Sequence, residues 1–442
     1  MSVMLSLSEI VKYYTPEFRE LLNELGEIAK TMNIVEMVTP LNAAEERKKW
    51  LEQAENGAYT NPQFQYNGRL LAEIANKESA LQELTQKMGK MTKQLSAEDP
   101  GRVLTELAWR RRDELEATIW LAQCMLQGDD SNADAALVLI YGAPEDLTVA
   151  AAHDYAKAMA SGKAYRQRDT PQLKTVREKL QKVFCDAKRV QEEFIWVAEQ
   201  SGIAQTRPVE IDPIATAVDV RDKSSRGPIV VIPAGYEAYG VTLVRLCAHE
   251  ILCHWADSER AARALPLLGG GALKPADETL YEGHATWAGN ATGMMLGEKT
   301  QRQRLPFYII AMSLARKGMN FADVATALYE IIRPTEATDK AALELTWKTC
   351  MRVFRGSHGN QDNALAHYAF TKDRAYFEGH LVAERLHDQG FDSILDVATL
   401  SLGDIELLKT VVQFERRTDS FVRMGSILQE QVSRLIDEEF VL

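Results

Sequence analysis

Two histidines and a glutamate lie in the apolar segment 246–255, and their spacing limits the local structure more than any other feature of the chain. His249 and Glu250 are adjacent, and His254 follows His249 by five residues. Five residues of a regular α-helix turn through about 500°, which leaves the two imidazoles roughly 140° apart. If both face one point, the helix must contain a π-type turn, whose i to i+5 bonding stacks positions 249 and 254. The alternative is a pair of unrelated histidines on a buried helix.

This arrangement is one residue longer than the His-Glu-x-x-His pattern of zinc hydrolases, in which the histidines bind the ion and the glutamate is the general base. We therefore predict one Zn²⁺ per chain, bound by His249 and His254, with Glu250 as the catalytic base. Catalytic zinc usually has three protein ligands, and Glu282, on the next predicted helix, is the candidate third. Glu278, one helical turn earlier, is an alternative that the sequence leaves open.

Cys253 is a rival ligand of a different kind. It lies four residues after His249, so in an unbulged helix it would share that face in place of His254. A His-Glu-x-x-Cys pair is an uncommon hydrolase arrangement, so we interpret Cys253 as a small buried residue. We interpret the glycine run 269–271 as a loop that could gate a site, and the arginine run 110–112 as a solvated helix face.

Apolar residues recur at helical spacing through most of the chain. Before residue 205 this spacing predicts helices at about 8–32, 42–54, 69–94, 102–127, 130–140, 145–160 and 171–200. Asn42 is the predicted N-cap of the second of these. From residue 241 onward it predicts helices at about 241–262, 277–295, 302–318, 321–333, 337–355, 370–388, 403–417 and 424–438.

Residues 208–235 differ, because four prolines surround short β-favouring runs. The continuously apolar run 229–232 predicts a buried strand just before the histidine helix, and its edge could hold an extended peptide. The alternative is a core strand without a ligand. The predicted fold class is thus α+β, mainly α-helical, with a small β element before the zinc-binding helix. We divide the chain into a helical N-terminal region (1–204), a metallopeptidase core (205–400) and C-terminal helices that pack on the core (401–442).

The formal net charge of −12 argues against nucleic acid or an anionic membrane surface as a partner, because both require a basic footprint. The five cysteines form no Cys-x-x-Cys pair, and their odd number favours reduced thiols. The first residues lack the basic leader of a signal peptide, and no apolar run approaches membrane-spanning length. We therefore expect a cytoplasmic protein, and nothing in the sequence specifies its oligomeric state.

Several short motifs, taken in their order, resemble the tyrosine carboxypeptidase family, which includes the microtubule-associated tyrosine carboxypeptidases and bacterial proteins named for a Q-E-G-L-A motif. The resemblance spans residues from about 36 to about 390. It rests on Pro40-Leu-Asn42, Asn61-Pro62-x-Phe64-x-Tyr66, His249-Glu250-x-x-x-His254, Glu282-Gly283-x-Ala285, Arg352-Val-Phe-Arg355-Gly356 and Phe370-Thr-Lys372-Asp373-x-x-Tyr376-x-x-Gly379.

The resemblance implies a zinc metallopeptidase with His249, His254 and Glu282 as ligands and Glu250 as base. It also implies that residues 352–376 help to line the pocket. A carboxypeptidase needs a cation for the terminal carboxylate of its substrate. The candidates are Arg352, Arg355 and Lys372, while Tyr376 is a candidate donor to the developing oxyanion. Each of these four also has a plain interpretation as a helix-surface or packing residue.

We therefore expect removal of a C-terminal residue from a peptide or protein tail. The alternatives are endopeptidase or aminopeptidase activity with the same metal centre, and a non-catalytic regulatory or scaffold protein with a structural metal or none. The chain departs from the family pattern at Leu252 and Cys253, where H-E-I-G-T-H has Gly and Thr, and at Tyr281 and His284, where Q-E-G-L-A has Gln and Leu. These departures spare every predicted ligand, so we expect them to affect substrate preference more than metal binding.

Overall fold

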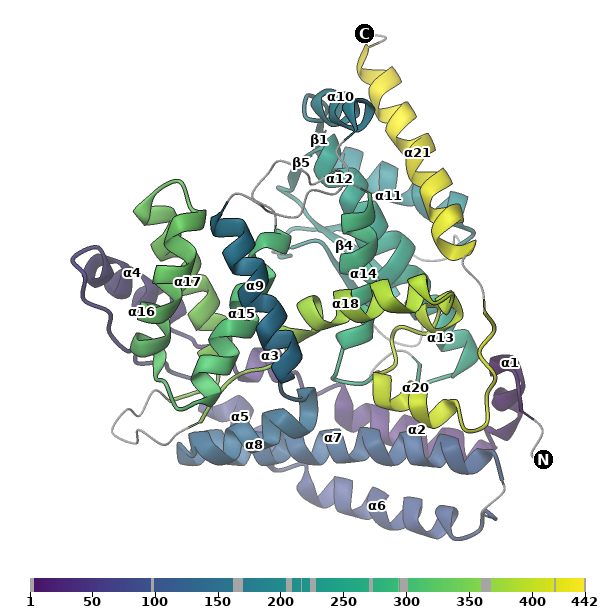
Figure 1. Cartoon of the computed structure of the whole chain (residues 1–442). Helices are drawn as coiled ribbons and strands as arrows, with labels where there is room; N and C mark the ends of the chain where they lie inside the picture. Colours follow the sequence, from purple (N-terminus) through teal and green to yellow (C-terminus); the bar gives the residue numbers. More distant parts are fainter. Residues whose placement is uncertain are drawn as a thin grey trace.

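Long helices surround a small β element in the computed structural model of the chain (Figure 1). The structure describes residues 4–96, 99–161, 170–203, 209–215, 217–222, 228–269, 273–292, 294, 301–358, 367–416 and 419–440. The predicted class, mainly α-helical α+β, is confirmed. The predicted division into three regions stays a prediction.

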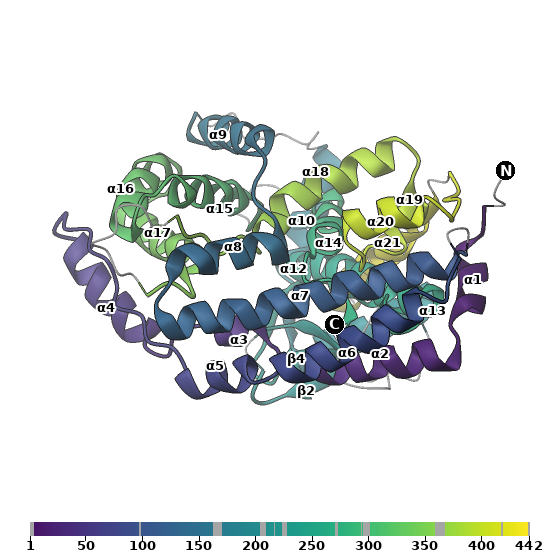
Figure 2. The ribbon, with the colours of Figure 1, turned by 90° about the horizontal axis from the view of Figure 1, so that it is seen from below.

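The first half is built around one long helix, α7. The elements are α1 (Leu7–Ile10), a 3-10 turn (Val11–Tyr13), α2 (Pro16–Ala29), α3 (Ile34–Met37), α4 (Ala43–Ala54), α5 (Gly68–Ala75), α6 (Glu78–Thr92), α7 (Gly101–Gln127), α8 (Asp130–Tyr141), α9 (Asp146–Ala160), α10 (Pro171–Leu180) and α11 (Ala187–Ser201). Figures 1 and 2 show α2, α6 and α8 lying along α7. The alternation of apolar and charged residues in these helices buries their shared faces.

Two predicted helices in this half are divided. Residues 8–32 form α1 and α2 because Pro16 begins a new helix, in which the Thr15 side chain accepts a hydrogen bond from the Phe18 N–H. Residues 69–94 form α5 and α6, which are separated at residues 76–77. The predicted N-cap Asn42 makes no capping bond; its side chain instead accepts from the Gln65 N–H and donates to the Gln63 carbonyl.

The helix predicted over residues 171–200 is interrupted by a strand, β1 (Phe184–Asp186), which pairs antiparallel with β5 (Glu237–Tyr239). A three-residue strand has no periodicity of its own to read, so only the partner strand reveals it. The same reason applies to residues 403–417. There α20 (Leu402–Leu408) ends early because the following segment bonds to Leu5, which donates to the Val411 carbonyl and accepts from the Gln413 N–H.

The predicted small sheet has three strands in the order β2-β4-β3: β2 (Val209–Asp212), β4 (Pro228–Pro233) and β3 (Asp219–Asp222). The predicted strand 229–232 is the central one, parallel to β2 and antiparallel to β3, and Val230, Val231 and Ile232 are fully buried. Because both of its edges are paired, β4 has no free edge for a peptide, and the suggestion that it binds one is wrong. The free edges belong to β2 and β3.

The second half begins with a continuous rod: α12 (Gly240–Leu246), a π-helix (Cys247–Trp255) and α13 (Ala256–Ala264). It continues through α14 (Thr279–Ala291), α15 (Gln301–Arg316), α16 (Phe321–Ile332), a 3-10 turn (Arg333–Thr335), α17 (Asp339–Phe354), α18 (Arg374–Asp388), α19 (Asp392–Leu395), α20 and α21 (Asp419–Phe440). Two buried apolar clusters result. The larger joins Leu22, Val244 and Leu428, and the smaller holds α15, α16 and α17 against α4 and α9.

No single helix among the described residues has the length and apolar composition to cross a membrane; α8 and α9 meet that test only as a pair bent by 91°. Of the glycine run 269–271, only Gly269 is described, so the predicted gating loop lies outside the described residues.

Candidate metal centre

The π-helix brings the two histidines of the sequence pattern together, as the five-residue spacing predicts. The ring centroids of His249 and His254 are 4.6 Å apart, with the ring planes at 83°. The π bonding extends over nine residues, Cys247–Trp255, and is therefore longer than a single bulged turn. Both imidazoles thus leave one side of the helix.

Glu282 reaches this pair from α14. Its Oε2 lies 3.4 Å from Nε2 of His254 and 3.9 Å from Nε2 of His249. Zinc bonds of 2.0–2.1 Å in a tetrahedron separate the ligand atoms by about 3.3 Å. Two imidazoles and a carboxylate are donors of the types that fit the ion, and the 3.4 Å separation of Glu282 from His254 matches this value. Ligand atoms of His249, Glu250 and His254 also lie within 4.8 Å of one another, and this group could hold a metal ion.

Two carboxylates therefore stand near the imidazoles. Glu250 Oε1 is 3.9 Å from Nε2 of His249, whereas Glu282 is within 3.9 Å of both rings. We favour Glu282 as the third ligand because it bridges both imidazoles. Burial raises the pKa of Glu250 to about 7, with Glu282 adding to the shift and His254 opposing it. A carboxyl that titrates near neutrality suits proton transfer, and a bound cation would lower its pKa again.

The two imidazoles differ in their electrostatics. Burial, and then the neighbouring His254, lower the pKa of His249 well below its usual value, which keeps it neutral and ready to bind a metal. Burial is the largest single influence on the pKa of His254 and acts to lower it, but the carboxylates of Glu282, Glu250 and Asp257 together outweigh it, and the net shift is upward. An ion bound between them would replace the proton that Glu282 now favours on His254.

Glu278, the alternative third ligand, is held away from the histidines. Its two oxygens contact Nζ of Lys372 at 2.8 Å and Nζ of Lys274 at 3.1 Å. The two lysines hold the pKa of Glu278 well below its usual range although burial opposes them. Cys253 is also turned away, because its Sγ lies 3.9 Å from the carbonyl oxygen of His284.

Helices α14 and α18 cross closely next to Glu282. A Cβ atom built on Gly283 would lie 2.1 Å from the carbonyl carbon of Gly379, so the two backbones touch there. Glycine permits this approach because it has no Cβ atom. The crossing brings Tyr376 near Glu282, whose charge, followed by burial, raises the pKa of Tyr376 well above its usual value. Tyr376 thus stays protonated and can donate a hydrogen bond.

The three predicted substrate cations each have a carboxylate partner within the chain. Arg352 donates twice to Asp373, at 2.5 and 2.6 Å, and Arg355 lies 3.5 Å from the same carboxylate. Lys372 is the partner of Glu278. Their role in binding substrate stays a prediction, and any substrate carboxylate there would compete with Asp373 or Glu278.

The sequence alone did not reveal which residues pack and hydrogen-bond around His254. Tyr281 donates to the His254 carbonyl at 3.2 Å, and its ring lies 4.1 Å from the imidazole between centroids. His284 forms a 2.8 Å ion pair with the fully buried Asp257. Tyr281, Cys253 and His284 are positions where the chain departs from the family pattern; Cys253 contacts His284, and Tyr281 contacts His254. Asp257 lies four residues after Cys253 on the same rod, and this spacing is the one sequence signal for it.

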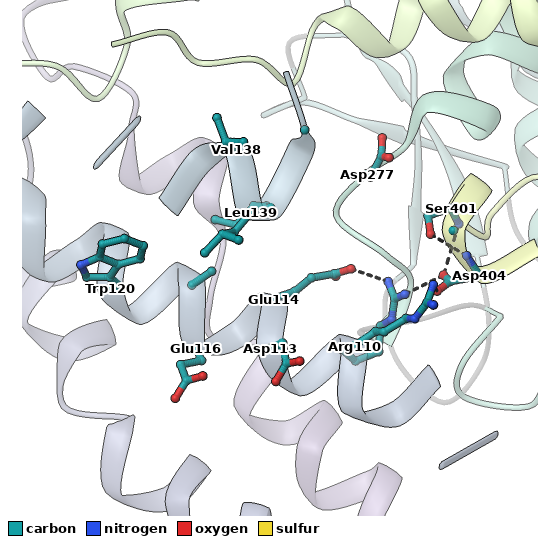
Figure 3. A pocket seen from close by; sticks show the side chains of 15 residues that line it. Arg110, Asp113, Glu114, Glu116, Trp120, Val138, Leu139, Asp277, Ser401 and Asp404 are labelled. Atoms are coloured by element: carbon teal, nitrogen blue, oxygen red, sulfur yellow. Dashed lines mark hydrogen bonds and ion pairs between the residues drawn. The ribbon is translucent and has the colours of Figure 1, made fainter. Parts of the chain in front are cut away.

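A separate cavity of about 740 Å³ lies between α7, α8 and α20 (Figure 3). The burial of Arg111 beside this cavity corrects our interpretation of the arginine run 110–112. Arg111 is only 3% exposed and contacts Asp404 at 2.6 Å and Glu114 at 2.8 Å, so it is not on a solvated helix face. None of the predicted site residues lines this cavity.

The fold and the site define a mainly helical protein with a buried cluster of imidazoles and carboxylates that could hold a metal ion. The family model described as microtubule-associated tyrosine carboxypeptidase matches residues 52–420, so the chain belongs to that family. The family assignment confirms the resemblance seen in the motifs. It makes the chain a member of a carboxypeptidase family, for which a peptide or protein is the substrate. A comparison with curated proteins gives no match.

Proposed function

We propose that the protein is a zinc-dependent carboxypeptidase that removes the C-terminal residue from a peptide or protein tail. One observation carries the proposal. Oε2 of Glu282 lies within 3.9 Å of Nε2 of both His249 and His254, and a further carboxyl, Glu250, stands beside them. In this proposal His249, His254 and Glu282 hold one Zn²⁺, which when bound would polarise the scissile carbonyl and make water more acidic.

The chain's own residues then move the protons. Glu250 takes a proton from the attacking water and passes it to the leaving amine. Its position supports this role, because its Oε1 lies 3.9 Å from Nε2 of His249, beside the proposed ion but outside the proposed ligand set. Tyr376, which stays protonated, donates to the oxyanion that develops on the scissile carbonyl.

The test compares synthetic peptides of one sequence that end in a free acid or in an amide. The zinc-loaded protein should release the last residue from the free acid only, and Glu250→Gln should slow this release at least about 1000-fold. Glu192→Gln, at an exposed position on α11, is the matched control and should keep full activity.

The alternatives give different results in the same experiment. Equal cleavage of both peptides would support an endopeptidase or an aminopeptidase with the same metal centre. If metal binds but neither peptide is cut, the protein is a non-catalytic member of its family.

A further inference from the structure

One arginine next to the histidine cluster forms no ion pair with any carboxylate that the structure describes. Arg245 lies on α12, one helical turn before His249. Its Nε is buried without a hydrogen-bond acceptor, and within the described part of the chain no carboxylate forms an ion pair with it. Buried polar groups are nearly always hydrogen-bonded, and a buried charge is costly unless it is paired. Arg245 is therefore suited to an acceptor that comes from outside the chain.

Arg245 and His249 rest against the same point of α14. A Cβ atom built on Gly289 would lie 3.3 Å from Cγ of Arg245 and 3.9 Å from Cβ of His249. Because the two residues are four apart, they share one face of the rod as it meets α14. Arg245 is thus the neighbour of a predicted metal ligand on the side away from His254.

The charge of Arg245 affects the pKa values of groups in and near the histidine cluster. It acts to lower the pKa values of His249 and Glu250, and that of Tyr236 on the loop before β5. Burial is the main influence on the guanidinium itself and lowers its pKa, while Glu250 and Tyr236 oppose this. An anion placed between Arg245 and the histidines would therefore meet a positive field that is close to the general base.

A carboxypeptidase requires a cation close to its metal. The scissile carbonyl and the terminal carboxylate are separated by one residue, and consecutive Cα atoms are about 3.8 Å apart. The anchoring cation must therefore be a near neighbour of the metal ligands. Arg352, Arg355 and Lys372 already contact Asp373 or Glu278, so a substrate carboxylate would have to displace an internal one.

We infer that Arg245 binds the terminal carboxylate of the substrate, so that the residue to be released lies between Arg245 and the histidine cluster. The inference rests on the proposed function and names the residue by which the protein would recognise a free C-terminus. A guanidinium can hold a carboxylate through two parallel hydrogen bonds, which would also fix the orientation of the last residue.

The test measures binding, so that it does not depend on turnover. In the zinc-loaded Glu250→Gln protein, calorimetry should give a free-acid peptide an affinity about 30- to 100-fold higher than that of its amide. Adding Arg245→Gln should abolish this difference, because it should weaken the binding of the free-acid peptide only. Arg245→Lys should keep part of it, because the charge remains while the paired hydrogen bonds are lost.

Two controls separate binding from folding. Arg263→Gln, at a largely exposed position on α13, should leave the difference unchanged. Zinc content and the unfolding temperature of Arg245→Gln should match those of the parent, because removal of a buried unpaired charge does not destabilise a fold. In a Glu250-containing background, Arg245→Gln should raise KM for the free acid by a similar factor.

The outcomes separate this inference from the proposed function. If the wild-type protein cleaves in a Glu250-dependent way and Arg245→Gln retains the preference for the free acid, the inference fails and the function stands. Loss of the preference in Arg352→Gln or Lys372→Gln, with Arg245→Gln unaffected, would move the anchor to that residue. Absence of both cleavage and metal would refute the function and the inference together.

Discussion

Gly283 and Gly379 bring α14 and α18 into backbone contact. A Cβ atom on Gly283 would lie 2.1 Å from the carbonyl carbon of Gly379, and one on Gly379 would lie 1.8 Å from the carbonyl oxygen of Thr279. Any side chain at either position must push the helices apart. The contact follows Glu282 directly in the sequence and lies one turn after Tyr376, so it sets the distance between two predicted site residues.

We therefore expect Gly283→Ala or Gly379→Ala to destabilise the protein by about 3 kcal/mol or more, because backbone cannot yield as a flexible side chain does. Thermal or urea unfolding measures this, and zinc affinity should fall with it. Gly89→Ala in α6, where nothing lies within 4 Å, is the control and should be neutral or up to about 1 kcal/mol stabilising. Equal behaviour of the three variants would contradict the backbone contact.

His254→Ala should remove the metal. The wild-type chain should contain about one zinc per molecule after purification, because three ligands and a water complete the usual tetrahedron. The variant should lose that zinc, and its unfolding temperature should no longer rise when zinc is added. Elemental analysis provides the measurement, and His153→Ala, outside the cluster, is the control. Stoichiometric zinc in His254→Ala would reject the ligand assignment.

Tyr376→Phe should lower kcat by about 100- to 1000-fold while KM and zinc content stay near the wild-type values, because an oxyanion donor acts in the transition state. Steady-state kinetics on a free-acid peptide would reveal this pattern. Tyr329→Phe, on α16, is the control. A change in KM alone would instead make Tyr376 a substrate-binding residue.

Glu114 provides a pH test away from the metal centre. Glu114 lines the cavity (Figure 3), and its carboxyl lies 2.8 Å from Arg111. Burial raises the pKa of Glu114 to about 7, although Arg111 and the Ala276 N–H oppose the shift. A raised folded-state pKa means that the folded protein binds the extra proton. Stability from this group is therefore present at low pH and is lost as the pH rises from about 4.5 to about 7, by up to about 3 kcal/mol.

Glu114→Gln cannot lose that proton. The unfolding temperature of this variant, relative to the wild type, should therefore rise steadily between pH 5 and pH 8. Glu116→Gln, on the same helix but with a 58% exposed side chain, should show no such trend. A constant difference for Glu114→Gln over this range would show that the buried carboxyl does not titrate there.

Features that depend on residues near in the chain were predictable. The spacing of His249 and His254 predicted a π-type turn if both were to face one point, since helix geometry relates residue number directly to direction. The helical regions followed from their apolar spacing, except where Pro16 or a distant strand intervened.

The choice between similar side chains was decided by the tertiary structure. Glu278 and Glu282 are one turn apart and chemically alike, but Lys274 and Lys372 hold the first, while the imidazoles face the second. Asp373 likewise forms an ion pair with Arg352, whereas no described carboxylate forms one with Arg245. Helical periodicity is a property of neighbouring residues, so the sequence by itself determined the π-helix and the pair of histidines on it. Ion-pair partners come from segments far apart in the chain, so only the packing of those segments decided which carboxylate faces the imidazoles and which arginine pairs with no described carboxylate.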